Sequence, residues 1–135
     1  YQAVSGAGTE AMTELRTQTE NVLKGSTPEA SVFKHPIPFN CIPQIGSFDS
    51  EGHSSEEKKV IQETKKILNL PNLKVSCTAV RVPVFMGHSE SVSMEFEKPI
   101  DLGEARSALK TFPGIHLLDS PENSVYPMNS TPSGY

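Results

Sequence analysis

Two strand-like segments that follow one another directly set the strongest limit on how this chain folds. Residues 74–86, KVSCTAVRVPVFM, are rich in β-branched side chains, and residues 91–97, SVSMEFE, alternate apolar and polar positions as a half-buried strand does. The two segments join near Gly87, where glycine permits the backbone angles of a turn. Strands adjacent in sequence usually lie side by side, so the pair indicates a largely antiparallel sheet.

Capping signals place helices on either side of these segments. Ser54 and Glu57 form an S-x-x-E capping box before an apolar helical pattern, and Asp101 with Glu104 repeats the signal further along the chain. A third helical pattern covers residues 9–24, where apolar side chains recur on one face. Helices should therefore begin directly after Ser54 and Asp101, with another before both.

Shorter extended patterns at residues 39–48 and 115–119 complete the order of elements. Pro43 makes the first of them an edge or bulged element, because proline cannot donate to a strand ladder. The order is extended, helix, strand, helix, strand, strand, helix, strand. It predicts an α+β fold with a mixed, largely antiparallel sheet and helices layered on one face, in one domain over residues 1–135.

The charge balance argues against nucleic acid as a partner. Twelve basic and 16 acidic residues give a net charge of −4, and no block of like charge exceeds a few residues. No apolar run approaches the roughly 18 residues that span a bilayer, and the first residues lack the pattern of a secretory signal. We expect a cytoplasmic protein without membrane contact.

The two cysteines, Cys41 and Cys77, do not suggest a metal or redox site. They are too far apart for a CxxC motif, and no histidine lies nearby at metal-ligand spacing. We expect both to be buried thiols that act as small apolar side chains, and we expect no metal.

Arg81 and His88 bound an apolar run, and the sequence leaves two interpretations of them open. In a straight strand they would point to opposite faces, roughly 23 Å apart at about 3.3 Å per residue. They would then be a strand arginine with an exposed head and a turn histidine. Pro83 or Gly87 could instead supply a bulge or turn that brings them to a shared site.

Other candidates are equally ambiguous by themselves. Glu56 and Lys59 lie three apart at the start of a predicted helix, so they face the same way and could both reach a ligand or form a surface ion pair. Gln2 and Ser5 precede a glycine-containing loop, where amide and hydroxyl side chains could orient a substrate or cap a turn.

Four segments in order resemble the aspartate-semialdehyde dehydrogenase family over nearly the whole chain. They are YQAVSGAG, FNCIPQI, EExxxxxETKKIL and VRVPVFMGHSES, at residues 1–8, 39–45, 56–68 and 80–91. The resemblance is to the family's substrate-binding and dimerisation domain, which is similar to the C-terminal domain of glyceraldehyde-3-phosphate dehydrogenase. It implies a homodimer or homotetramer.

The resemblance also implies a reaction. The family reduces L-aspartyl 4-phosphate to L-aspartate 4-semialdehyde with NADPH and releases inorganic phosphate, on the route to lysine, threonine and methionine. Carried onto this sequence, His88 corresponds to the general acid and base and Gln2 to the residue that orients the acyl group. Arg81 corresponds to the clamp on the substrate carboxylate, Glu56 to the partner of its ammonium group, and Lys59 to the phosphate ligand.

Ser5 and Gly6 would border the nicotinamide of NADP, which the family binds mainly through another domain. The family's nucleophilic cysteine lies in an Asn-Cys motif upstream of the Tyr-Gln pair with which this chain begins. We therefore expect the nucleotide-binding domain and the catalytic cysteine segment to be absent from the chain, and the chain alone to be inactive.

A non-catalytic dimerisation or ligand-binding module of the same fold is the alternative. An enzyme half needs Gln2, Glu56, Lys59, Arg81 and His88 close together, whereas such a module does not. Their arrangement in space distinguishes the two.

Overall fold

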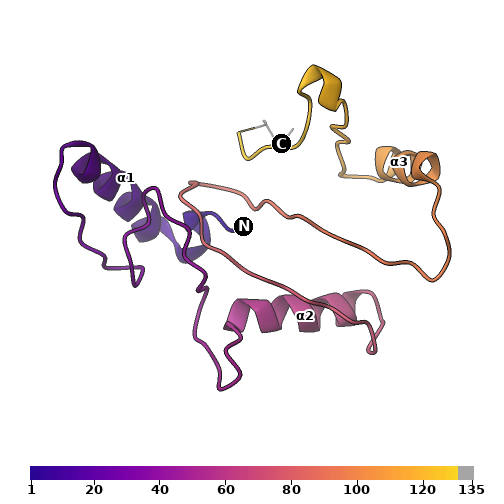
Figure 1. The fold of residues 1–135 in the computed structure, drawn as a ribbon, viewed down its shortest axis with the longest axis horizontal. Coiled ribbons are helices and arrows are strands. Elements are labelled where there is room, and N and C mark those ends of the chain that lie inside the picture. The colour runs from indigo at the N-terminus through magenta and orange to yellow at the C-terminus, as the bar shows by residue number, and fades with distance from the viewer. Residues whose placement is uncertain (131–135) are drawn as a thin grey trace. The chain divides into compact units, whose positions relative to one another are not determined.

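The computed structural model describes residues 1–130, which fall into two compact units with a boundary between Ser89 and Glu90. The first unit holds the 3-10 helix η1 (Val4–Ala7) and the helices α1 (Thr9–Leu23) and α2 (Ser55–Ile67). The second holds α3 (Leu102–Thr111) and the 3-10 helix η2 (Pro121–Asn123). Figure 1 shows long irregular segments between these helices.

The core of the first unit forms where α1 packs on η1 and on the loop that follows α1. Its buried residues share one small apolar cluster, against which Met12 and Phe33 also pack: Val4, Ala11, Leu15, Ile37 and Ile42. The helix predicted over residues 9–24 is confirmed within one residue. Its inner face is partly polar, however, since Glu14 and Gln18 are buried beside Leu15.

Helix α2 begins as its capping box predicts. The Ser54 hydroxyl accepts a hydrogen bond from Glu57 N (3.4 Å), and the Glu57 carboxylate accepts one from Ser54 N (2.8 Å). Gly46 lets the preceding loop reach the first turn, because its φ is +83° and an added Cβ would lie 1.9 Å from Ser55 Oγ. Glu57 also accepts a hydrogen bond from Ala79 N (3.1 Å), which fastens α2 to the extended segment before Arg81.

Helix α3 begins after Asp101, whose carboxylate accepts a hydrogen bond from Glu104 N (3.0 Å), so this capping signal is confirmed as well. It ends at Thr111, just before Pro113 and Gly114. Both capped helices were predictable because a cap and an apolar periodicity lie within the same few residues.

The predicted sheet is not confirmed. Residues 1–130 contain isolated bridges only, including Gln2 with Arg81, Gln2 with His88 and Ile42 with Arg81. In residues 74–80 the odd-numbered side chains are the more buried, as in a strand, but the segment forms no bridge until Arg81, where the pairing is isolated. Residues 91–97 belong to no strand, and residues 115–119 likewise.

The physical reason is that an extended segment becomes a strand only when a neighbour accepts its backbone hydrogen bonds. At Pro83 the chain turns, since Val84 N donates to Val82 O (2.8 Å), and Gly87 takes a φ of +87°. The strand predicted over residues 74–86 therefore stops short. In residues 91–97 the alternate apolar side chains remain exposed, with Val92 at 64%, Met94 at 69% and Phe96 at 51%.

The expectation of two buried cysteines is wrong for Cys41, which is exposed. Its neighbour Ile42 takes the inward position and is 5% exposed, so Cys41 points to the opposite side of the extended backbone. Cys77 is half-buried. Among residues 1–130, no group of three or more His, Cys, Asp and Glu side chains is close enough to hold a metal ion. Nor does this described part contain a helix of the length and apolarity that a membrane crossing requires.

Candidate functional site

A chain reversal at residues 83–87 brings the backbones of Arg81 and His88 to either side of Gln2. The backbone of Gln2 lies between two limbs of the same loop and pairs with both. On one side Gln2 N donates to Val80 O (2.8 Å), and Val82 N donates to Gln2 O (3.0 Å). On the other side Gln2 forms an antiparallel bridge with His88. Arg81 and His88 thus flank one residue, instead of standing a whole strand apart.

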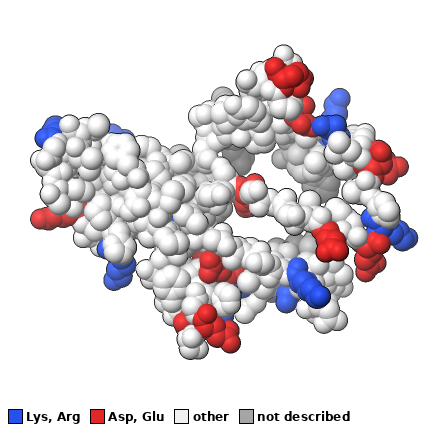
Figure 2. Space-filling view, in the orientation of Figure 1, with Lys and Arg blue, Asp and Glu red and all other residues white. Residues whose placement is uncertain are grey.

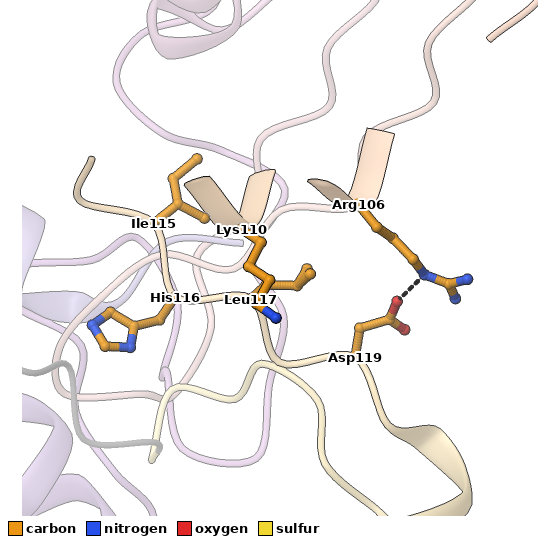
Figure 3. Close-up of a pocket in the computed structure, with 6 residues that line it drawn as sticks. All are labelled: Arg106, Lys110, Ile115, His116, Leu117 and Asp119. Carbon is orange, nitrogen blue, oxygen red and sulfur yellow. Dashed lines mark hydrogen bonds and ion pairs between the residues drawn. The ribbon is translucent and has the colours of Figure 1, made fainter. Parts of the chain in front are cut away.

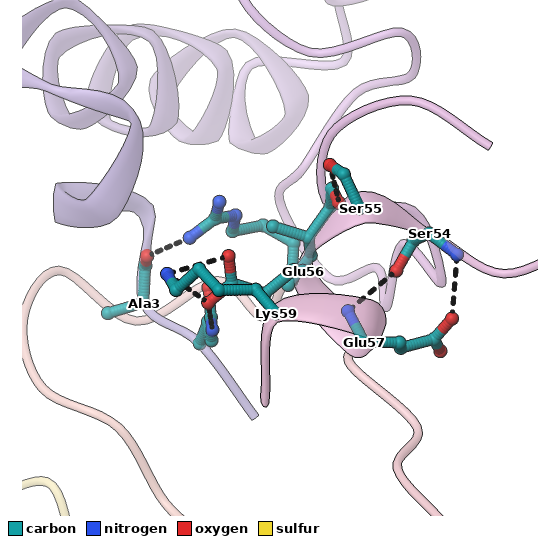
Figure 4. Close-up of polar contacts among 9 residues, drawn as sticks. Ala3, Ser54, Ser55, Glu56, Glu57 and Lys59 are labelled. Atoms are coloured by element: carbon teal, nitrogen blue, oxygen red, sulfur yellow. Dashed lines mark hydrogen bonds and ion pairs between the residues drawn. The ribbon is translucent and has the colours of Figure 1, made fainter. Parts of the chain in front are cut away.

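The side chain of Gln2 extends the contact to the start of α2. Its Nε2 donates to Glu56 Oε1 (2.7 Å), and Lys59 Nζ donates to both oxygens of the same carboxylate, at 3.0 and 3.1 Å. Figure 4 shows the Lys59 ammonium group over the Glu56 carboxylate, on the side of α2 that faces Ala3. Three residues that the sequence predicted for one site therefore form a single hydrogen-bonded cluster.

Glu56 is fixed in place by backbone contacts as well. Its N–H donates to Ile45 O (3.3 Å), and the N–H of Ser55 donates to Ser47 O (2.9 Å), so the exposed donors of the first turn of α2 are satisfied by the preceding loop. The pKa of Glu56 is lowered, chiefly by the hydrogen bond from Gln2, against an opposing effect of burial and with further help from Lys59. The carboxylate is therefore held in its charged form.

Arg81 is the most buried cation of the cluster, at 6% exposure. Its Nη1 donates to Ala3 O (2.7 Å), and its guanidinium lies over the ring of Phe33, 5.9 Å from the centroid. Burial lowers its pKa, and the negative charge of Glu56 opposes that effect. An arginine remains charged under such conditions, so the site holds a buried positive charge next to a carboxylate.

The remaining predicted residues lie at the edge of this cluster. Ser5 and Gly6 belong to η1, and Ser5 N donates to Phe85 O (3.1 Å) in the same loop. A Cβ at Gly6 would lie 2.9 Å from Arg81 Nη1, so η1 packs directly on the guanidinium. His88 is exposed, and its backbone joins the cluster through Gln2.

Phe33 is a residue of this cluster that no sequence pattern predicted. It lies in the loop after α1, with no motif around it, and its proximity to Arg81 depends on contacts between segments far apart in the chain. Taken together, the cluster offers two cations, one carboxylate and one amide, and the backbone of His88 lies at its edge. Such a set suits a small molecule that carries both acidic and basic groups.

A shallow pocket in the second unit lacks these features. Figure 3 shows Arg106 turned toward Asp119, with Nε to Oδ2 at 2.5 Å, while His116 points away from that pair. Its other lining residues are Lys110, Ile115 and Leu117, and none is a predicted site residue. Figure 2 shows the acidic and basic side chains singly or in small groups within each unit. We assign no role to this pocket.

Comparison with known proteins gives one consistent result. Residues 1–134 match the family model described as "Semialdehyde dehydrogenase, dimerisation domain". Aspartate-semialdehyde dehydrogenase of Aquifex aeolicus is 50% identical over 129 residues, which are 95% of this chain and 38% of that protein. The enzyme of that name from Shewanella violacea is 44% identical over 133 residues, 98% of this chain and 39% of that protein.

Solved structures agree. Aspartate semialdehyde dehydrogenase II from Vibrio cholerae, crystallised in complex with ASA, superimposes with a TM-score of 0.83 at 46% identity, over 86% of this chain and 34% of that one. The chain thus spans about two fifths of the length of the curated relatives it matches. By sequence and by fold, this chain belongs to the semialdehyde dehydrogenase dimerisation-domain family.

Proposed function

We propose that the chain is the substrate-binding and dimerisation part of an aspartate-semialdehyde dehydrogenase. The enzyme would reduce L-aspartyl 4-phosphate to L-aspartate 4-semialdehyde with NADPH and release phosphate, on the route to lysine, threonine and methionine. The observation that carries the proposal is Gln2, whose backbone pairs with the limbs that bear Arg81 and His88 and whose amide binds Glu56. The names of the relatives support it.

The chemistry of each group suits one part of that substrate. The planar guanidinium of Arg81 would grip the α-carboxylate with two parallel hydrogen bonds, a geometry that lysine cannot offer. Glu56, held in its charged form, would bind the α-ammonium group. Lys59 would bind the phosphate, because its side chain is 53% exposed and its ammonium group can move toward solvent.

Substrate binding would break the contact between Lys59 and Glu56. An exposed ion pair of this kind contributes only about 0.2–1 kcal/mol, so a substrate that offers an ammonium group to Glu56 and a phosphate to Lys59 can replace it at little cost. The pair thus keeps both charges partnered until the substrate arrives.

His88 would act as general acid and base, since its side chain is exposed at the edge of the cluster and histidine is the side chain that enzymes use most often for proton transfer. Gln2 would orient the acyl group, with its amide already directed by Glu56. The nucleophilic cysteine would come from the part of the enzyme upstream of the Tyr-Gln pair, as in the family pattern.

NADP, when bound, would supply or accept the hydride. Ser5 and Gly6 fit a border for its nicotinamide ring, because Gly6 is exposed and lacks a side chain directly beside Arg81. A flat surface at this point would let the ring lie next to the substrate clamp. The assembled enzyme would be a cytoplasmic homodimer or homotetramer.

The test is the reverse reaction of the full-length enzyme, followed as NADP reduction in the presence of aspartate semialdehyde and phosphate. Arg81→Lys should raise KM for the aldehyde by tenfold or more, since the charge stays but the paired geometry is lost, and His88→Asn should lower kcat by about 10²- to 10⁴-fold. Arg106→Lys makes the same chemical change at an arginine of the second unit and serves as the control. Unchanged kinetics for Arg81→Lys and His88→Asn would favour the non-catalytic module instead.

A further inference from the structure

We propose that Phe33 positions Arg81 for carboxylate binding. We propose further that the side chains of Glu14 and Gln18 on α1, called the clasp here, hold Phe33 in place for this purpose. The inference rests on the proposed role of Arg81 as substrate clamp. It extends the site to a loop, residues 29–37, that no motif marks, and it makes Phe33 a determinant of substrate affinity without placing it against the substrate.

Three groups from separate segments fix the Arg81 guanidinium. Ala3 O accepts a hydrogen bond from Nη1 (2.7 Å), and the backbone of Gly6 leaves no room for even a methyl group on that side, with a Cβ at 2.9 Å. The Phe33 ring covers a third side, with its centroid 5.9 Å from Cζ. An aromatic face attracts a guanidinium that lies within about 6 Å of the ring centroid, so the ring draws the Arg81 head group to this side of the site.

The clasp binds the backbone and side chains next to Phe33. The Glu14 carboxylate on α1 accepts hydrogen bonds from Ser31 Oγ (2.6 Å) and Val32 N (2.5 Å), the two residues directly before Phe33. Gln18, one turn along the helix, donates to Glu29 O (2.7 Å) and accepts from Ile37 N (3.0 Å). The loop is therefore tied to α1 before, beside and after the ring.

The two side chains of the clasp are both polar and both buried. Glu14 is 8% exposed and Gln18 is 2% exposed, and burying a carboxylate is costly unless several donors satisfy it. Phe33 also packs against the apolar cluster of the first unit, so the ring has little freedom to leave Arg81. A guanidinium that is already oriented loses less conformational entropy when the substrate binds.

A double-mutant cycle in the full-length enzyme tests the inference. Phe33→Leu keeps an apolar side chain against the core but removes the aromatic face, and Phe33→Tyr keeps the face. We expect Phe33→Leu to lower kcat/KM for aspartate semialdehyde by about five- to twentyfold, mainly through KM, with the KM for phosphate unchanged. Phe33→Tyr should stay within about twofold of the wild type. In an Arg81→Gln background, Phe33→Leu should cost less than about twofold, because the group it positions is gone.

Each outcome separates the inference from the proposal on which it rests. If Arg81→Gln alone leaves kcat/KM unchanged, the proposed role of Arg81 is wrong, and this inference is wrong with it. Suppose instead that Arg81→Gln lowers kcat/KM. If Phe33→Leu then lowers kcat/KM by the same factor in the wild type and in the Arg81→Gln background, or has no effect in either, the inference alone is overturned. Hydrogen exchange of residues 29–37 shows whether Phe33→Leu keeps the loop folded; if it opens the loop and Phe33→Tyr is also impaired, the ring acts through packing and the inference again fails.

Discussion

Glu14→Gln is the perturbation for which the structure allows the closest estimate. The carboxylate of Glu14 accepts four hydrogen bonds, from Ser31 Oγ (2.6 Å), Ser31 N (3.3 Å), Val32 N (2.5 Å) and Gln18 Nε2 (2.9 Å). Glutamine has the same shape but replaces one accepting oxygen with an NH₂ group. That group would face the donors of the loop, and the negative charge would be lost.

The cost follows from the hydrogen bonds that disappear. A hydrogen bond to a charged group contributes about 1.5–3 kcal/mol. Ser31 and Val32 are exposed, so water can replace part of the lost acceptor, and the estimate stays at the low end for two such bonds. Because the remaining oxygen still accepts some of the donors, we expect the variant to lose roughly 3 kcal/mol of loop stability. Local opening of residues 29–37 would then be roughly 150-fold more frequent.

Hydrogen exchange measures this opening directly. In the full-length enzyme, amides of residues 31–37 should exchange roughly 150-fold faster in Glu14→Gln, while amides of α2 keep their protection. Glu20→Gln makes the same change at an exposed position of α1 and should leave the loop unaffected. If the two variants exchange alike, the hydrogen bonds of Glu14 do not hold the loop, and the clasp described above is wrong.

The same contact predicts a dependence on pH. Burial raises the pKa of Glu14, but hydrogen bonds from Ser31, Val32 and Phe33 outweigh burial, and the net pKa lies below the ordinary value of 4.5. A carboxyl group with a lowered folded pKa stabilises the fold above its unfolded pKa, and this contribution is lost as the pH falls through the folded value. Loop protection in the wild type should therefore be constant at neutral pH and decline below about pH 4.5. In Glu14→Gln this acid-dependent part should be missing.

Two further predictions concern the site and the chain as a whole. Gly6→Ala should raise KM for aspartate semialdehyde and leave the thermal stability nearly unchanged, because the new Cβ would stand 2.9 Å from Arg81 Nη1 and the guanidinium would have to shift. Kinetics and thermal unfolding of the full-length enzyme measure the two effects. A lower melting temperature with an unchanged KM would contradict this prediction. We expect no turnover when the chain alone is given aspartate semialdehyde, phosphate and NADP, because acid and base catalysis by His88 cannot replace a covalent nucleophile. Measurable NADP reduction would mean that Cys41 or Cys77 serves as the thiol.

The helices were predictable because their determinants are local. Ser54 and Glu57 stand three residues apart and satisfy each other's backbone, so the start of α2 depends on little else in the chain. The sheet depends on partners. In residues 91–97 apolar and polar side chains alternate as in a strand. This alternation predicts only which side chains would be buried if a neighbouring strand were present. A pattern of that kind cannot identify its own partner.

The site was predictable only in part, for a related reason. The contact of Glu56 with Lys59 follows from helical spacing and is visible in the sequence. The contact of Phe33 with Arg81 joins residues 48 positions apart. The loop that carries Phe33 is bound by Glu14 and Gln18, whose polar side chains occupy buried positions on α1. The burial of Glu14 and Gln18 is visible only in the structure, so the sequence alone does not direct attention to the loop.

The stretch from Arg81 to His88 shows why a motif can be more informative than the secondary structure inferred from it. As a strand, the segment would separate its two polar ends by roughly 23 Å. Pro83 and Gly87 interrupt the strand, and the resulting reversal places Gln2 between the ends, with hydrogen bonds to Val80 and Val82 on one side and a bridge to His88 on the other. The residues that prevent a regular strand are thus the ones that assemble the site. A prediction based on propensity treats them as defects, whereas the chemistry proposed for Arg81 and His88 requires them.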